Sequence, residues 1–309
     1  MSLTGALPAR FRRERVLIIG CGDVGLRAAR VLGQPQRVRV LALTSSPERA
    51  PLLREQGITP LRGNLDDPAD LRRLAGLATR VLHLAPPPSG DMPDWRLDTR
   101  TRALTRALAQ RSPPLSLVYG STSGVYGDAQ GRWVSEAMPA QPRTPRAWRR
   151  VDAEASVHWL GRALGVRTSV LRIPGIYAPD RPGGTPRERL QRGTPVLRPE
   201  DDVYTNHIHA DDLARACVLA LWRGRPQRNI NVVDDTELKM GDYFDLAADL
   251  YGLPRPPRLD RVSANDQLPL MLLSFMSESR RLRNQRMKDE LRLRLHHPTV
   301  AQGLRSGAR

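Results

Sequence analysis

The sequence predicts an α/β protein with a doubly wound parallel sheet and a smaller C-terminal lobe. Three observations predict this fold class: a glycine-rich turn joins a strand pattern to a helix pattern near the N-terminus, strand and helix patterns then alternate, and the composition changes after residue 177. Alternating strands and helices form parallel sheets with right-handed crossovers and helices on both faces. Ligands of such sheets bind where the carboxyl ends of the strands meet.

The glycine-rich turn lies between Arg15 and Gly33. An apolar run at 16–19 predicts a buried strand, and apolar residues recur at helical spacing after residue 25. Between them stands a GxGxxG pattern, whose strand–turn–helix context is that of a dinucleotide fingerprint. The residues expected to contact the cofactor here are Gly20, Gly22, Asp23, Val24 and Gly25. We therefore expect an NAD(P)-binding Rossmann domain; the alternative is a tight turn that binds nothing.

Each glycine of the pattern has its own physical task. Gly20 lets the chain turn sharply, Gly22 lets backbone N–H groups approach a pyrophosphate, and Gly25 lets the helix pack close to the strand. The helix N-terminus adds unpaired N–H groups and the positive end of its dipole.

Strands and helices are then expected in alternation. The later strands are predicted at 37–43, 58–61, 81–85, 115–119 and 166–173. The helices between them are predicted at 48–56, 68–74, 97–108 and 151–164. The first of these helices begins with Ser46-Pro47, an N-cap residue followed by a proline at the first helical position.

The pattern changes from residue 176 onward. Residues 180–199 are rich in Pro, Gly and Arg and predict an exposed connection. Helices at 211–222 and 243–251 and a strand at 229–233 follow, and an arginine-rich helix at 287–295 predicts a solvated face. The expected domains are a Rossmann domain at 12–177, to which 204–234 return, and a smaller substrate lobe formed by 178–203 and 235–309.

Composition excludes several classes of protein. The 309 residues carry a net charge of +17, but the arginines are dispersed and aromatic residues make up 5%, so nucleic acid is not the expected partner. The two cysteines, Cys21 and Cys217, are too few for a disulfide framework or a zinc site, and no metal is expected. No apolar run suits a membrane helix, and arginines interrupt the first fifteen residues where a signal peptide would be apolar. A cytoplasmic protein is expected.

The end of the second predicted strand bears on cofactor choice. NAD-selective folds carry an acidic residue there, whereas this chain has Thr44, Ser45 and Ser46, followed by Arg49. Hydroxyls and a guanidinium would accept a 2′-phosphate that a carboxylate would repel. We therefore expect NADP in preference to NAD, although Arg49 is also compatible with an ordinary surface position.

The motifs taken together resemble a known family. They are GCGDVG at 20–25, GNLDD at 63–67, HLAPP at 83–87, YGSTSGVYGD at 119–128, LRIPGIYAP at 171–179, HIHADDLA at 207–214 and NVVDD at 231–235. In this order they resemble the extended short-chain dehydrogenase/reductase superfamily, its NAD(P)-dependent epimerase/dehydratase group, and most closely atypical members with a GCGDVG fingerprint. The resemblance covers nearly the whole chain.

The resemblance implies roles for individual residues. Asn64 and Leu65 match the pair that contacts adenine, although the family more often has Asp where Asn64 stands. Leu84 and Ala85 match the strand end beside the nicotinamide ribose. Thr122 matches the catalytic Ser/Thr that hydrogen-bonds a substrate oxygen. Pro174 to Tyr177 match the turn that borders the nicotinamide and the substrate. His209 matches a structural residue that holds the second lobe.

The chain departs from the family at its catalytic pair. The family has a Tyr and a Lys four residues apart, and by the same count this chain has Arg146 and Arg150. A guanidinium does not deprotonate at neutral pH, so Arg146 cannot be a general acid, although it can polarise a carbonyl or bind an anion. Arg150 retains a cation for the cofactor ribose.

Three interpretations of this departure stay open. Tyr126 supplies the phenol from a neighbouring loop, Arg146 gives electrophilic help while water exchanges the proton, or the chain binds the dinucleotide without redox turnover. The leading hypothesis is an NAD(P)-dependent oxidoreductase or epimerase-like enzyme acting on a small carbonyl or hydroxyl substrate, compatible with an anionic group. The alternative is a catalytically inactive dinucleotide-binding regulatory or sensor protein. The resemblance is also compatible with a homodimer.

Overall fold

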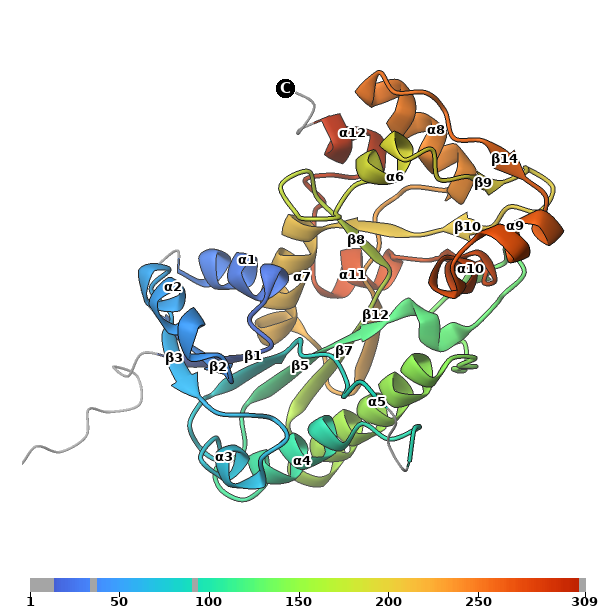
Figure 1. Cartoon of the computed structure of the whole chain (residues 1–309). Helices are drawn as coiled ribbons and strands as arrows, with labels where there is room; N and C mark the ends of the chain where they lie inside the picture. The colour runs from blue at the N-terminus through green and yellow to red at the C-terminus, as the bar shows by residue number, and fades with distance from the viewer. Residues whose placement is uncertain (1–13, 34–37, 91–93, 306–309) are drawn as a thin grey trace, which may run out of the picture.

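The computed structural model describes residues 14–33, 38–90 and 94–305. Within them, seven strands form one parallel sheet in the order β3-β2-β1-β4-β5-β7-β12 (Figure 1). The strands are β1 (Glu14–Ile19), β2 (Val38–Thr44), β3 (Thr59–Arg62), β4 (Arg80–His83), β5 (Ser116–Thr122), β7 (Arg167–Ile173) and β12 (Arg228–Asn231). This confirms the predicted doubly wound sheet. Arg37 and the first residues of the predicted Rossmann domain lie outside the described residues.

Helices cover both faces of the sheet (Figure 1). One face carries α1 (Asp23–Leu32), α2 (Ala50–Glu55) and α7 (Ala210–Arg223), and the other carries α3 (Pro68–Arg72), α4 (Thr99–Leu108) and α5 (Pro145–Leu164). The alternation of side chains along β1 explains this arrangement, because Val16 and Ile18 pack with the first set and Leu17 and Ile19 with the second. All four are fully buried, so the predicted apolar run is a strand covered on both faces.

The remaining elements form a second lobe and its connections. The strands there pair two by two: β8 (Gly175–Tyr177) with β11 (His207–His209), β9 (Val196–Leu197) with β14 (Arg258–Leu259), β10 (Tyr204–Thr205) with β13 (Leu238–Lys239), and β6 (Trp133–Val134) with β15 (Arg281–Leu282). The helices are α6 (Arg187–Gln191), α8 (Met240–Tyr251), α9 (Arg261–Gln267), α10 (Leu270–Met276), α11 (Gln285–Glu290) and α12 (Val300–Arg305). No helix in the described part of the chain is both long and apolar enough to cross a membrane.

Two predictions for this second region were wrong. Residues 180–199 contain α6 and β9, and Leu190, Val196 and Leu197 are buried in the core of the second lobe rather than exposed. The arginine-rich segment is helical only at 285–290, and Leu291 and Leu293 pack into the core of the sheet. Both segments are rich in charged residues, and the few apolar residues among them pack against partners that are distant in sequence. The local pattern therefore predicted exposure.

The helix that carries the two candidate arginines begins earlier than predicted. α5 begins at Pro145, and the hydroxyl of Thr144 accepts a hydrogen bond from the amide of Ala147 at 3.2 Å. A threonine N-cap followed by a proline is a typical helix start. Arg146 and Arg150 therefore both belong to α5, one turn apart and on one face.

Candidate functional site

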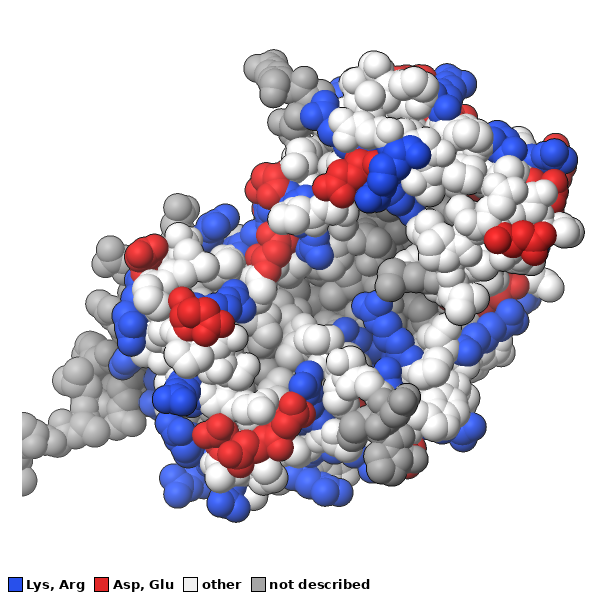
Figure 2. All heavy atoms as spheres, in the orientation of Figure 1, with Lys and Arg blue, Asp and Glu red and all other residues white. Residues whose placement is uncertain are grey.

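The surface is hollowed between the sheet and the second lobe, and basic residues lie along part of the rim (Figure 2). The strand ends that face this region are those of β1, β4, β5 and β7, because the four strands are parallel neighbours. Carboxyl ends of parallel strands are the usual binding edge of this fold class. The predicted site residues divide into two groups along this edge.

Gly20 forms the sharp turn that the sequence predicts. It has a φ of +83°, and a Cβ at this position would overlap the backbone of Leu84 and Ala85. The amides of Leu84 and Ala85 both donate to the carbonyl of Ile19, at 2.7 and 3.1 Å. The predicted ribose-side residues therefore lie directly against the glycine turn.

Gly22 leaves the start of α1 open. It is the N-cap residue and provides no side-chain cap, and a Cβ built on it would meet nothing within 4 Å. Gly25 allows close packing, since its Cβ would lie 3.1 Å from the carbonyl oxygen of Gly20. An uncapped helix start beside open space suits a diphosphate, so these residues fit the predicted group.

Arg49 reaches back to the glycine turn from a short 3-10 helix, Pro47–Arg49, that follows β2. Its Nη2 donates to the carbonyl oxygen of Cys21 at 2.7 Å, and no carboxylate among the described residues lies within ion-pair distance of it. Ser45 is exposed beside it. Asn64 is exposed after β3, where its amide donates to Asp70, and Leu65 packs partly into the core. These side chains surround the place where the sequence predicts the adenosine end of the cofactor.

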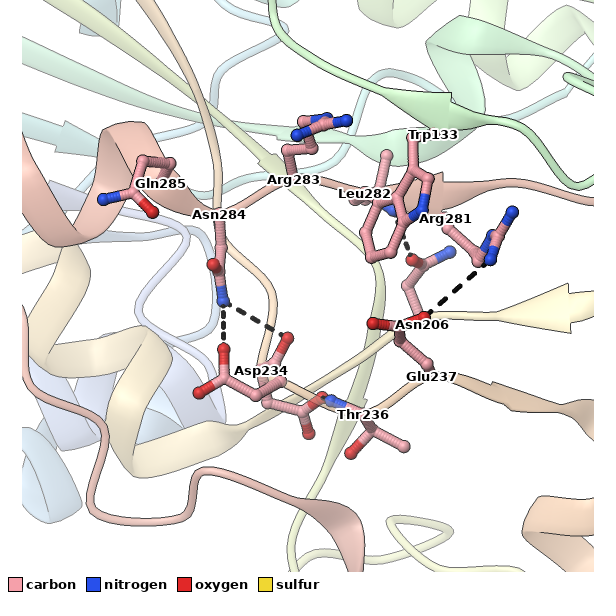
Figure 3. Close-up of a pocket in the computed structure, with 11 residues that line it drawn as sticks. Trp133, Asn206, Asp234, Thr236, Glu237, Arg281, Leu282, Arg283, Asn284 and Gln285 are labelled. Carbon is pink, nitrogen blue, oxygen red and sulfur yellow. Dashed lines mark hydrogen bonds and ion pairs between the residues drawn. The ribbon is translucent and has the colours of Figure 1, made fainter.

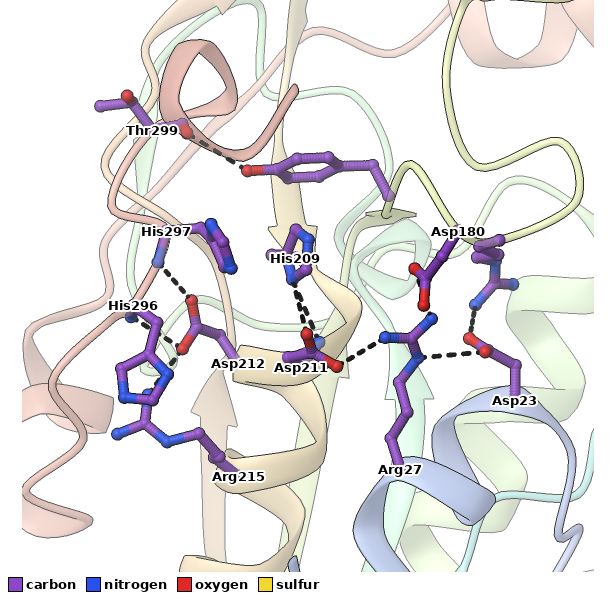
Figure 4. A network of polar contacts seen from close by, with 12 residues as sticks. Asp23, Arg27, Asp180, His209, Asp211, Asp212, Arg215, His296, His297 and Thr299 are labelled. Carbon is purple, nitrogen blue, oxygen red and sulfur yellow. Dashed lines mark hydrogen bonds and ion pairs between the residues drawn. The ribbon is translucent and has the colours of Figure 1, made fainter. Parts of the chain in front are cut away.

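Asp23 belongs to a network of ion pairs that the sequence did not indicate (Figure 4). Its carboxylate accepts from Arg27 and from Arg181, each at 3.0 Å. Arg27 also binds Asp180 at 2.7 Å and Asp211 at 2.5 Å. Burial would lower the pKa of Arg27, but its hydrogen bonds to three carboxylates outweigh that effect and raise the pKa above its usual value. The network joins segments 150 to 190 residues apart in sequence, which no local pattern could reveal.

Thr122 is the last residue of β5 and belongs to the second group, the residues predicted to act on the substrate. Its hydroxyl oxygen accepts from the amide of Gly124 at 3.2 Å, which leaves its own hydrogen free to donate. Thr122 pairs with Ile173 in the sheet, so Pro174, the next residue, lies at the neighbouring strand end. The structure thus brings together the two residues predicted to border the substrate.

Arg150 is anchored within the protein. Its Nη1 donates to the carbonyl of Gly120 at 2.6 Å and to the hydroxyl of Tyr119 at 3.0 Å, and only 7% of the residue is exposed. Arg146, one turn earlier, is exposed, and no carboxylate of the described residues pairs with it. Partial desolvation and the charge of Arg150 lower the pKa of Arg146. The free guanidinium of the pair is therefore Arg146.

Tyr126 does not fit the predicted role of proton donor. It is 1% exposed, its hydroxyl donates to Asn231 at 2.8 Å, and burial raises its pKa. Tyr119 is also fully buried, and burial raises its pKa despite the neighbouring Arg150. This burial disfavours the interpretation that Tyr126 replaces the missing phenol, which stays a prediction.

A buried ion pair lies beneath the second group of site residues, around Thr122 and Arg146. Arg172 binds Glu154 at 2.7 Å, both are about 5% exposed, and Ser121 donates to Glu154 at 2.6 Å. The guanidinium of Arg172 also lies 4.6 Å from the ring centre of Tyr126. This pair fixes β5, α5 and β7 where Thr122 and Arg146 are presented.

His209 has a structural environment. Its Nδ1 accepts from the amide of Asp211 at the start of α7, and its ring lies 3.8 Å from the ring of the half-buried His297. His209, Asp211 and His297 bring ligand-type atoms within 4.8 Å of one another. Nδ1 of His209 accepts from the Asp211 amide and Oδ1 of Asp211 binds Arg27, whereas Nε2 of His209 is buried without a hydrogen-bond partner among the described residues.

Asp212 lies beside this cluster and is fully buried (Figure 4). Its two oxygens accept from the backbone amides of His296 and His297, at 2.9 and 2.8 Å, and one of them also accepts from Arg215. α7 thereby holds the C-terminal segment against the sheet.

A separate cavity of about 250 Å³ lies between β15 and the turn that follows β12 (Figure 3). Arg281 and Arg283 stack on Trp133 at its edge, and Asp234, whose pKa burial raises to about 8, lies in its wall. None of the site residues predicted from the sequence lines this cavity. It is therefore distinct from both groups.

Comparisons with known proteins identify the family and the fold. The profile of the NAD dependent epimerase/dehydratase family matches residues 16–232. A functionally unknown conserved protein from Silicibacter pomeroyi is 31% identical, with a TM-score of 0.77 over 95% of this chain and 98% of that one. No curated protein sequence matches.

Two solved epimerases share the fold at lower identity. UDP-glucuronic acid 4-epimerase from Bacillus cereus, solved with NAD, is 18% identical with a TM-score of 0.73, over 95% of this chain and 97% of that one. UDP-glucose 4-epimerase from Thermotoga maritima, solved with UDP-glucose, is 17% identical with a TM-score of 0.76 over the same shares.

Proposed function

The chain belongs to the NAD dependent epimerase/dehydratase family, and from this premise we propose that it is an NAD(P)-dependent oxidoreductase or epimerase-like enzyme. Its substrate is a small carbonyl or hydroxyl compound that carries an anionic group. The observation that carries the proposal is the open start of α1 at Gly22, at the same sheet edge as Thr122. That edge offers a place for a dinucleotide and, beside it, a hydroxyl for a substrate oxygen.

Preference for NADP over NAD is part of the proposal. Arg49 supports it, because its guanidinium lies against the glycine turn without a carboxylate partner in the described chain. A 2′-phosphate would give it that partner through charge-assisted hydrogen bonds.

The residues of the second group divide the remaining work. A nicotinamide bound at this edge would supply or accept the hydride. Thr122 donates its free hydroxyl hydrogen to the reacting oxygen and orients it, while Arg146 donates to the same oxygen or to an anionic substituent. Arg150 keeps its charge close to the cofactor while Gly120 and Tyr119 hold it. Since Arg146 retains its proton, water exchanges the proton of the reaction.

A specific observation supports a second candidate, an inactive dinucleotide-binding sensor. The hydroxyls of Tyr119 and Tyr126 are buried and hydrogen-bonded within the protein, which disfavours either of them as a replacement for the tyrosine that the family has at the position of Arg146. Binding without turnover of any carbonyl or hydroxyl compound would favour this candidate.

The first test is isothermal titration with NADPH, NADP, NADH and NAD. We expect the phosphorylated pair to bind, and Arg49→Ala to weaken that pair about tenfold, the equivalent of about 1.4 kcal/mol, with little effect on NADH. Arg54→Ala removes an exposed arginine of the neighbouring α2 and is the matched control. Absence of binding to all four dinucleotides would overturn the proposed function, and equal effects of Arg49→Ala on NADPH and NADH would overturn the NADP preference.

A further inference from the structure

The loop between β8 and α6 is fastened to the start of α1 by two reciprocal ion pairs. Asp180 of the loop accepts from Arg27 of the helix at 2.7 Å, and Arg181 of the loop donates to Asp23 of the helix at 3.0 Å (Figure 4). Within the loop, the amide of Arg181 donates to Ala178 and the amide of Gly184 donates to Arg181. The loop therefore presents Arg181 to the glycine turn in a defined backbone conformation.

Asp23 poses an electrostatic problem for the proposed dinucleotide. It is the first residue of α1, directly after the open position at Gly22. A carboxylate there is stabilised by the helix dipole when no ligand is present, but it would repel a diphosphate that approaches the same N–H groups. Two guanidiniums, Arg27 and Arg181, currently neutralise it.

The two guanidiniums differ in their freedom to leave Asp23. Arg27 is 7% exposed and is also bound to Asp180 and Asp211. The side chain of Arg181 is 29% exposed, and in the described part of the chain Asp23 is its one carboxylate partner. Arg181 can therefore change partner without opening the network, whereas Arg27 cannot.

We propose that Arg181 moves from Asp23 to the diphosphate of the bound dinucleotide, while Arg27 continues to neutralise Asp23. This inference rests on the proposed dinucleotide binding and adds a residue from the second lobe to it. A diphosphate carries two negative charges, so a guanidinium gains more from it than from one carboxylate. Binding thus replaces one Arg181 ion pair with a stronger one, and the second lobe contributes directly to cofactor affinity.

Two substitutions at the two ends of the same ion pair test the exchange. Arg181→Ala removes the ligand for the diphosphate and should weaken NADPH binding at least tenfold by titration calorimetry. Asp23→Asn releases Arg181 and removes the repulsion, so it should tighten NADPH binding several-fold. Arg192→Ala, which removes an exposed arginine of the same lobe, is the control for net charge and should not change the affinity for NADPH.

Thermal unfolding of each variant without ligand separates binding from folding. If the ion pair served only to fasten the loop, Arg181→Ala and Asp23→Asn would weaken NADPH binding alike, and that outcome overturns the inference. If the wild-type protein binds NADPH and Arg181→Ala binds it with the same affinity, the inference is overturned and the proposed function stands. A wild-type protein that binds none of the four dinucleotides overturns both.

Discussion

The cofactor half and the catalytic half of the site are built from different parts of the chain. The centre of the proposed cofactor half, around Gly20 and Gly22, is backbone, namely a turn with a positive φ and an uncapped helix start, and the side chains of Arg49 and Arg181 lie beside it. The catalytic half, around Thr122 and Arg146, consists of side chains on an ordinary strand end and an ordinary helix. The difference teaches that a backbone site constrains the sequence through glycine, whereas a side-chain site can change chemistry on an unchanged scaffold.

The largest expected effect breaks the scaffold of the catalytic half. Arg172→Met leaves Glu154 buried without its charge partner, and we expect the free energy of unfolding in urea to fall by about 3 to 5 kcal/mol. The control is Arg255→Met, which removes an ion pair with Asp249 that is more than half exposed and should cause no measurable change. Equal losses in the two variants would mean that Arg172 and Glu154 do not support the scaffold.

The next effect separates strain from binding within the cofactor half. Gly20→Ala places a Cβ in the backbone of Leu84 and Ala85 at a positive φ, so it should cost about 2 to 5 kcal/mol of stability. Gly22→Ala meets open space and should keep the melting temperature but lose NADPH binding, because its methyl group occupies the approach of the diphosphate. If Gly22→Ala bound NADPH normally, the start of α1 would not be the diphosphate site.

A smaller effect tests whether side chains alone set the chemistry of the catalytic half. Arg146→Ala should lower kcat/KM for carboxylate-bearing carbonyl substrates tenfold to a hundredfold, about 1.4 to 2.7 kcal/mol, and leave NADPH affinity unchanged. Arg143→Ala, an exposed arginine just before α5, is the control. The turnover of the double variant Arg146→Tyr, Arg150→Lys should not exceed that of the wild type. A higher turnover would show instead that the protein is a reductase whose tyrosine and lysine have been replaced by arginines.

The smallest expected effect is a flat pH profile. Burial raises the pKa values of Tyr119 and Tyr126, which keeps both phenols neutral, and the guanidinium of Arg146 stays charged. Turnover between about pH 6 and 9 should therefore show no ionisation of a catalytic tyrosine. If kcat changed with pH in this range and that change disappeared in Tyr126→Phe, Tyr126 would be the proton donor after all.

The same comparison explains what the sequence could and could not predict. GxGxxG and the strand periods identify the sheet, the turn and the cofactor edge, because local backbone geometry dictates local residue types. The family resemblance was confirmed. The start of α5 was missed although Thr144-Pro145 indicates it, and that error obscured that Arg146 and Arg150 share one helix face.

Long-range partners were out of reach of the sequence. Charged residues at 180–199 and 287–295 resemble solvated surface until their partners in space are known. Arg27 is an example, since one buried guanidinium binds carboxylates from α1, from the loop after β8 and from α7. Only the tertiary structure shows that Arg181 lies at the glycine turn.

The buried carboxylate of Asp212 has a consequence for how the protein is made. Its amide partners, at His296 and His297, are translated 84 and 85 positions after Asp212 itself. The edge strand β12 is also translated late, at 228–231. In a nascent chain that has emerged only through α7, Asp212 has Arg215 but lacks both backbone amides, and the sheet has an open edge. The surroundings of Asp212 are therefore completed only after the segment with His296 and His297 has been translated, and until then the incomplete sheet edge is exposed to association.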